Sequence, residues 1–184
     1  MPRKQLILSR ELPYHCVNRV QNKQFYPKKY FEKIWLIYQT ALSSVSSRHE
    51  VKVHLFLLMR NHYHLLMTTP MGNLAEIMRE FQSEVSLKVR TLTGREEYKF
   101  SSRYKWSLIN EPRFFAQTYK YIVQNPVEAK ICQQVEQYKY SSFSFQLGHS
   151  SSTFSTPIFE RQNEAIWELL SDDLIERKAW ANSV

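Results

Sequence analysis

Cysteine is scarce in this chain of 184 residues, and long apolar runs are missing. The two cysteines, Cys16 and Cys132, lack the close spacing of a metal-binding motif, so we expect reduced thiols in a cytoplasmic protein. No apolar segment reaches the length of a membrane span. The apolar residues 6–8, behind a charged start, are too few for a signal sequence. We therefore expect a protein that does not enter a membrane.

Acidic side chains are also few, because 17 Asp and Glu residues face 25 Lys and Arg residues, for a net charge of +8. Residues 151–184 contain three basic and six acidic side chains, so residues 1–150 carry a net charge of +11. A basic body with 14% aromatic residues favours a polyanion such as nucleic acid as partner. The alternative is a charge that only keeps the protein in solution.

The chain divides near residue 148 into a main domain, 1–148, and an appendage, 149–184. A Ser- and Thr-rich stretch at 149–156 predicts a linker, and apolar spacing over 164–179 predicts an acidic amphipathic helix. The function of this helix is open from sequence. It could cover the basic surface, contact a second protomer or extend the core.

Residues 53–67 read as two apolar strands joined by a polar corner at Arg60-Asn61. Side chains two residues apart in a strand share one face, so His62 and His64 project together and Tyr63 projects to the other side. Two neighbouring imidazoles can bind one divalent metal ion, with at least one further ligand from another element. The alternative is a packed or hydrogen-bonded pair without chemistry.

Six further elements surround this hairpin. Alternation predicts strands over 12–20 and 102–110, and apolar spacing predicts helices over 28–48, 74–92 and 112–124, the last stopped by Asn125-Pro126, with a short helix over 127–136. His15 and Arg19 share one face of the first strand, as Arg103 and Lys105 do in the last. The order predicts an α+β, ferredoxin-like antiparallel four-stranded sheet with helices on one face, plus a C-terminal helical extension. The first strand and the second hairpin strand would be central.

Residues 61–66, Asn-His-Tyr-His-Leu-Leu, with His54 before them, resemble the histidine-hydrophobic-histidine (HUH) signature of single-tyrosine transposases. That family includes IS200-like insertion-sequence and REP-associated transposases. Residues 14–19, 103–105, 121–129 and 138–143 also resemble family motifs, in family order. The resemblance covers roughly residues 12–147 and implies the same ferredoxin-like fold.

The resemblance implies a protein that binds single-stranded or hairpin DNA and cuts and rejoins it through a phosphotyrosine, with Mg or Mn as cofactor. In the family the two histidines and a polar residue of the following helix hold the metal. For this chain that implies His62 and His64, with Gln82 or Glu84 as the third ligand. The residues expected at the DNA are His15, Arg19, Arg60, Arg103 and Lys105. The family contains monomers and dimers, so a homodimer is one alternative.

One position departs from the family pattern. The nucleophilic tyrosine is expected within 84–88 of the helix after the histidines, yet no tyrosine lies between Tyr63 and Tyr98. Tyr98 and Tyr104 are the remaining candidates, and both lie outside that predicted helix. Three interpretations follow: a family member that binds DNA without strand transfer, an active nuclease that uses one of these tyrosines or a metal-bound water, or a protein-interaction module without DNA chemistry. The first is the interpretation favoured by the sequence.

Overall fold

The structure is a computed structural model that describes residues 5–100 and 102–143. The linker and the acidic helix predicted at 149–156 and 164–179 lie outside the described residues. Within the described part of the chain, no helix is both long enough and apolar enough to cross a membrane.

Four strands and three helices form the fold of the described residues. They are β1 (Tyr14–Arg19), α1 (Phe31–Arg48), β2 (Lys52–Leu58), β3 (His62–Thr68), α2 (Leu74–Thr93), β4 (Lys105–Leu108) and α3 (Pro112–Glu128). Short 3₁₀ turns lie at Gln21–Lys23, Lys28–Tyr30 and Val135–Gln137. The strands pair antiparallel in the order β2-β3-β1-β4, so β1 and β3 are central. The predicted α+β sheet with its helices is confirmed.

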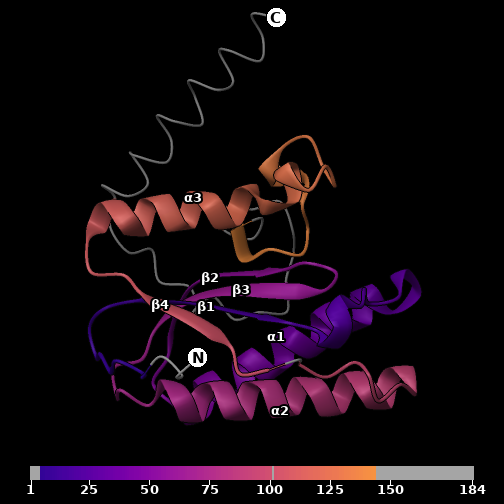
Figure 1. Ribbon diagram of the computed structural model, residues 1–184, viewed down its shortest axis with the longest axis horizontal. Helices are drawn as coiled ribbons and strands as arrows, with labels where there is room; N and C mark the ends of the chain where they lie inside the picture. Colours follow the sequence, from indigo (N-terminus) through magenta and orange to yellow (C-terminus); the bar gives the residue numbers. More distant parts are fainter. Residues whose placement is uncertain (1–4, 101, 144–184) are drawn as a thin grey trace, which may run out of the picture.

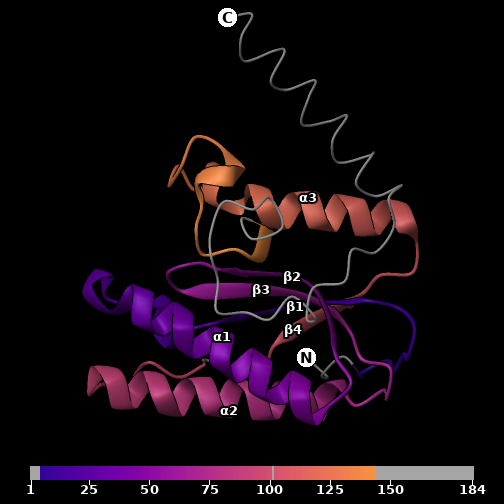
Figure 2. The same cartoon turned by 180° about the vertical axis from the view of Figure 1, so that it is seen from behind.

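The sheet separates two apolar layers, with α1 and α2 on one face and α3 on the other (Figures 1 and 2). The α1–α2 layer is built on contacting aromatic rings from both helices and the hairpin. These rings belong to Tyr38, Phe56, Tyr63 and Phe81. A smaller cluster between the sheet and α3 contains Leu57, Leu66, Phe115 and Ile122. The two helices of the ferredoxin-like pattern therefore share one face, and α3 closes the other.

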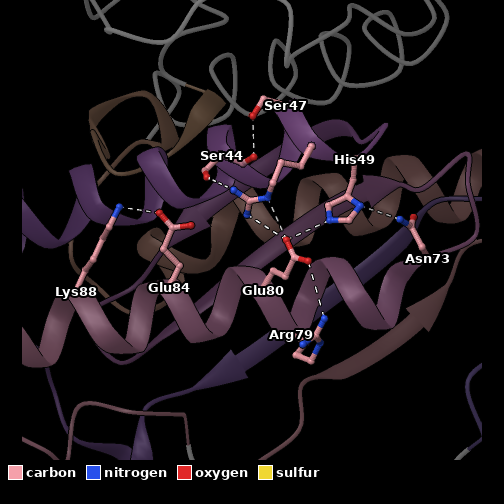
Figure 3. A network of polar contacts seen from close by, with 9 residues as sticks. Ser44, Ser47, His49, Asn73, Arg79, Glu80, Glu84 and Lys88 are labelled. Atoms are coloured by element: carbon pink, nitrogen blue, oxygen red, sulfur yellow. Dashed lines mark hydrogen bonds and ion pairs between the residues drawn. The ribbon is translucent and has the colours of Figure 1, made fainter.

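The α1–α2 layer is also tied together at its edge by a polar network around Glu80 (Figure 3). Its carboxylate accepts from the Arg48 guanidinium at 3.2 Å and from His49 Nε2, also at 3.2 Å. Asn73 Nδ2 donates to His49 Nδ1 at 3.0 Å, so the His49 ring connects the start of α2 to its second turn. The network joins the end of α1 to α2, away from the α3 face.

Helix α3 extends beyond the predicted stop at Asn125-Pro126 and ends at Glu128. Pro126 removes one N–H from the last turn only, and the helix closes past it. Ala129 N donates to Asn125 O at 3.0 Å, and Ile131 N donates to Pro126 O at 2.9 Å. Asn125 consequently stays helical, one turn after Tyr121. The helix predicted over 127–136 is a 3₁₀ turn at Val135–Gln137, and β4 is shorter than the predicted 102–110.

Candidate active site

The two histidines of β3 lie on the face of the sheet that α3 covers. In the β1–β3 ladder Arg19 is opposite His62 and Val17 is opposite His64, and opposite residues of antiparallel strands point to the same side. His15, two residues before Val17, shares this face. In the β1–β4 ladder Lys105 is opposite Val17, so β4 adds a cation to the same face.

A pocket of about 380 Å³ opens over these residues. Strand residues form most of its wall, and α3 supplies the rest. It is lined by His15, Val17, Arg19, His62, His64, Lys105, Trp106, Ser107, Tyr121 and Asn125. Three histidines, two cations, one tyrosine and one asparagine thus meet at one place between the sheet and α3.

The histidines are held by hydrogen bonds at one nitrogen each. His15 Nε2 lies 2.9 Å from His64 Nδ1, and His62 Nδ1 lies 2.6 Å from Asn61 Oδ1. The rings of His62 and His64 are 5.1 Å apart between centroids. His64 is 3% exposed, and within residues 5–100 and 102–143 its Nε2 is buried without a hydrogen-bond partner.

Burial keeps all three imidazoles neutral near pH 7. Desolvation lowers the pKa of His15 to about 4. Desolvation and the Arg19 charge lower the pKa of His62 to about 4, and the Asn125 side chain opposes this change. Desolvation lowers the pKa of His64 to about 2, with further lowering by His15, His62 and Arg19 and with the Asn125 side chain opposing the change. Neutral imidazoles have a lone pair to offer to a cation.

Helix α3 places a phenol and an amide against the histidines. The Tyr121 ring lies edge-on to His15 and His64, at centroid distances of 6.3 and 5.7 Å, and is 49% exposed. Asn125 follows at i+4, on the same side of the helix. Its Nδ2 donates to the Tyr121 carbonyl at 3.3 Å, which leaves the amide oxygen as an acceptor.

These residues fit a divalent metal. Among the described residues no group of three His, Cys, Asp or Glu side chains could hold an ion, so a ligand set here needs another residue type. His64 Nε2, which makes no hydrogen bond among the described residues, and the nearby His62 could supply two imidazole nitrogens, and the Asn125 amide could supply an oxygen. Imidazole suits transition metals and an amide oxygen suits Mg or Mn, so the mixed set is compatible with Mn.

The expected third ligands lie elsewhere. Gln82 and Glu84 belong to α2, on the opposite side of the sheet. Gln82 Nε2 donates to the Tyr63 hydroxyl at 2.5 Å, and Glu84 pairs with Lys88 at 2.7 Å. Because Tyr63 points away from the histidines, the sheet stands between these two side chains and the imidazoles. The structure therefore differs from the expectation that the helix after the histidines completes the ligand set.

The two candidate tyrosines lie on that far side as well. Tyr98 is 3% exposed, packs against the Tyr26 ring at 5.5 Å and donates to the Phe25 carbonyl at 3.4 Å. Tyr104 is 6% exposed in the α1–α2 layer, and burial raises the pKa of its hydroxyl. Neither lines the histidine pocket. Positions 84–88 are on α2 too, so the lack of a tyrosine there does not bear on the histidine face.

The predicted DNA-contacting residues fall into two groups. His15, Arg19 and Lys105 line the histidine pocket. A second pocket of about 440 Å³ shares Arg19 and Lys105 with it and adds Lys23 and Arg103. Together these two pockets form what we term the basic groove, with cationic side chains Arg19, Lys23, Arg103 and Lys105.

Arg60 lines neither pocket. Its Nη2 donates to the Tyr26 carbonyl at 2.7 Å, and its guanidinium lies over the Phe25 ring. This residue therefore fastens the segment before α1 to the hairpin corner.

Tyr121 and Asn125 are the site residues that the sequence analysis missed. Residues 121–129 entered the resemblance only as a helix, and no chemistry was assigned to them. The available signal was the i, i+4 spacing of two polar groups on a helix whose apolar positions, Phe115, Ile122 and Val123, lie elsewhere on its surface. The spacing alone does not place these two residues near the histidines, because the sequence does not tell which face of the sheet α3 covers.

The fold and the histidine pair together define the HUH class of single-tyrosine transposases. The family described as "Transposase IS200 like" matches residues 9–138, and the chain belongs to this family. The structure resembles that of a REP-associated tyrosine transposase bound to a REP hairpin, with a TM-score of 0.69 at 14% identity over 89% of this chain and 100% of that one. This likeness shows the shared fold.

A second solved structure, of a candidate transposase from Deinococcus radiodurans R1, gives a TM-score of 0.46 at 13% identity over 66% of this chain and 94% of that one. No curated protein matches the sequence.

Proposed function

We propose that this protein is a metal-dependent transposase that binds hairpin or single-stranded DNA in the basic groove and cuts and rejoins it at Tyr121. The observation that carries the proposal is the position of the Tyr121 ring, whose centroid is 5.7 Å from that of His64, in the lining of the same pocket as His62 and Asn125. A half-exposed phenol beside a cation site is placed to attack a phosphate bound there.

His62 and His64 would hold the metal through Nε2, because their Nδ1 atoms already have hydrogen-bond partners. Asn125 would add its amide oxygen. When bound, the metal polarises the scissile phosphate and offsets charge in the in-line transition state. Mn or Mg can supply this chemistry, and the nitrogen ligands favour Mn.

The phenol oxygen of Tyr121 attacks phosphorus, and the bond from phosphorus to the 3′ oxygen breaks. The proton lost by the phenol is balanced by the proton that the departing 3′ oxygen gains. The products are a 5′-phosphotyrosine and a free 3′-hydroxyl. Attack by a 3′-hydroxyl reverses the step and rejoins DNA, so no nucleotide cofactor is needed.

The cations of the groove orient the DNA. Arg19 and Lys105 line the same pocket as the histidines, so they would offset the charge of a phosphate bound there. Lys23 and Arg103 extend the positive surface into the adjoining pocket, which suits the backbone of an unpaired strand. The expectation of a protein without strand transfer rested on the lack of a tyrosine in helix α2. With Tyr121 as the proposed nucleophile, that expectation no longer applies. We propose that the protein acts in the cytoplasm, and a homodimer stays a prediction.

The test is covalent capture of DNA. The full chain is incubated with Mn²⁺ and a labelled pool of hairpins that carry randomised single-stranded flanks, and the products are separated on a denaturing gel. A hairpin pool is appropriate because the relative with a TM-score of 0.69 was solved with a REP hairpin. We expect a band of protein-bound label that EDTA abolishes.

Two tyrosine variants locate the chemistry. Tyr121→Phe removes only the hydroxyl of a half-exposed side chain, so the variant should fold and bind DNA yet form no adduct. The matched control is Tyr98→Phe, the same change on the other side of the sheet, which should keep the adduct. An adduct that survives Tyr121→Phe, or no adduct with the wild-type chain although DNA binds, would overturn the proposed chemistry.

A further inference from the structure

We propose that His15 is a positioning residue that keeps the proton of His64 on Nδ1 and so directs an unprotonated Nε2 into the pocket. Its purpose rests on the proposed function, because a bare Nε2 is what a metal requires. Nothing in the resemblance assigns such a role to this histidine.

The geometry of the pair is that of a hydrogen bond between two rings. His15 and His64 come from neighbouring central strands and stack with an interplanar angle of 16° at a centroid distance of 5.2 Å. Their facing nitrogens, His15 Nε2 and His64 Nδ1, are 2.9 Å apart. At that distance one nitrogen carries a hydrogen and the other accepts it.

The direction of the bond decides what His64 can do. If His15 donated, the His64 proton would be on Nε2, which makes no hydrogen bond among the described residues although the Asn125 side chain interacts with this ring. A buried donor without a hydrogen bond is unfavourable, and this one would point its hydrogen at the place where a cation would sit. If His64 donates from Nδ1, its Nε2 presents a lone pair there instead. The second arrangement agrees with the mixed ligand set of the pocket.

His62 supports the same direction independently. Its Nδ1 lies 2.6 Å from Asn61 Oδ1, and a carbonyl oxygen only accepts, so His62 carries its proton on Nδ1 and leaves Nε2 bare. Both proposed ligands then have the same tautomer, each held by a neighbour. His15 is not a ligand in this arrangement, because its Nε2 is occupied by His64. Partners of this kind commonly affect metal affinity by about 10–100-fold.

The first experiment observes the tautomer without metal. Long-range ¹H–¹⁵N NMR on the ¹⁵N-labelled full chain in EDTA identifies which ring nitrogen of His64 is protonated. We expect a protonated Nδ1 and a bare Nε2. A proton on Nε2 would overturn the inference whether or not the protein binds Mn²⁺.

The second experiment follows Mn²⁺ binding by electron paramagnetic resonance. His15→Leu removes the acceptor and should weaken binding about 10–100-fold. His15→Gln restores an acceptor oxygen near the same place and should recover most of that loss. His49→Gln, a change in a histidine of the α1–α2 layer, is the control and should leave binding unchanged.

The outcomes separate the two proposals. If the wild-type chain binds no Mn²⁺, the proposed metal site fails, while the NMR result still decides the tautomer. If the wild-type chain binds Mn²⁺ and His15→Leu binds it equally well, the positioning role is refuted and the metal site stands. If His15→Leu does not fold, His15→Gln decides. Mn²⁺ binding close to that of the wild-type chain would support the role of His15 as an acceptor, and binding weakened as much as by removal of His64 would refute it.

Discussion

Neutralising two cations of the basic groove should weaken DNA binding by a predictable amount. Arg103→Gln with Lys105→Gln removes two of the four groove cations. Each contact to a single strand contributes about 0.7 to the slope of log K against log salt, so the slope should fall by about 1.4. At about 0.1 M salt this is about a 25-fold loss of affinity, or about 2 kcal/mol. Fluorescence anisotropy of a labelled single strand over a salt series measures both quantities.

A matched double variant shows whether the position of the charges matters. Arg79→Gln with Lys88→Gln removes the same two charges from α2, on the far side of the sheet. A general effect of net charge would lower affinity in both double variants alike. If DNA binds in the basic groove, the α2 variant should keep a slope of log K against log salt close to that of the wild-type chain. Equal slopes for the two double variants would refute the groove as the DNA path.

Two further predictions concern stability. Burial lowers the pKa of His64 to about 2, against about 6.5 in an unfolded chain. Between these two pH values only the unfolded chain binds a proton on this ring, so the free energy of unfolding is highest above about pH 6.5 and decreases as the pH falls. Between about pH 7.5 and 5, the wild-type chain in EDTA should lose about 2 kcal/mol more unfolding free energy than His64→Gln; parallel urea curves would contradict this. Phe81→Ala, in the fully buried ring cluster, should cost about 3–5 kcal/mol, whereas Leu87→Ala, 59% exposed on the same helix, should change stability by less than about 0.5 kcal/mol. Equal urea midpoints for these two variants would show that the ring cluster is not the core.

Periodicity predicted much of the fold because its elements have two distinct faces. The alternation of β1 and the hairpin predicted which side chains share a face, and the ladder between β1 and β3 confirms that His15, Arg19, His62 and His64 do so. Helix α2 ends at Thr93, one residue past the predicted end, and Gly94 follows it in the left-handed conformation with a φ of 68°.

The proposed ligand set and the proposed nucleophile could not be inferred from the sequence, because both depend on which face of the sheet each helix covers. An amphipathic helix shows its apolar stripe but not the layer on which that stripe packs. Helix α2 follows the histidines directly, yet Gln82 reaches Tyr63 on the other face. Helix α3 comes much later in the chain and brings Tyr121 over the imidazoles. Proximity along the chain was therefore a poor guide to proximity at the site.

The most direct test of the account is to locate the DNA attachment by mass spectrometry. Adduct formed with Mn²⁺ is digested with nuclease and protease, and the peptide carrying a residual nucleotide is sequenced. The proposed chemistry predicts a phosphotyrosine at Tyr121, on the helix that covers His62 and His64. A modification at Tyr98 or Tyr104 would contradict it, because those side chains lie on the opposite side of the sheet.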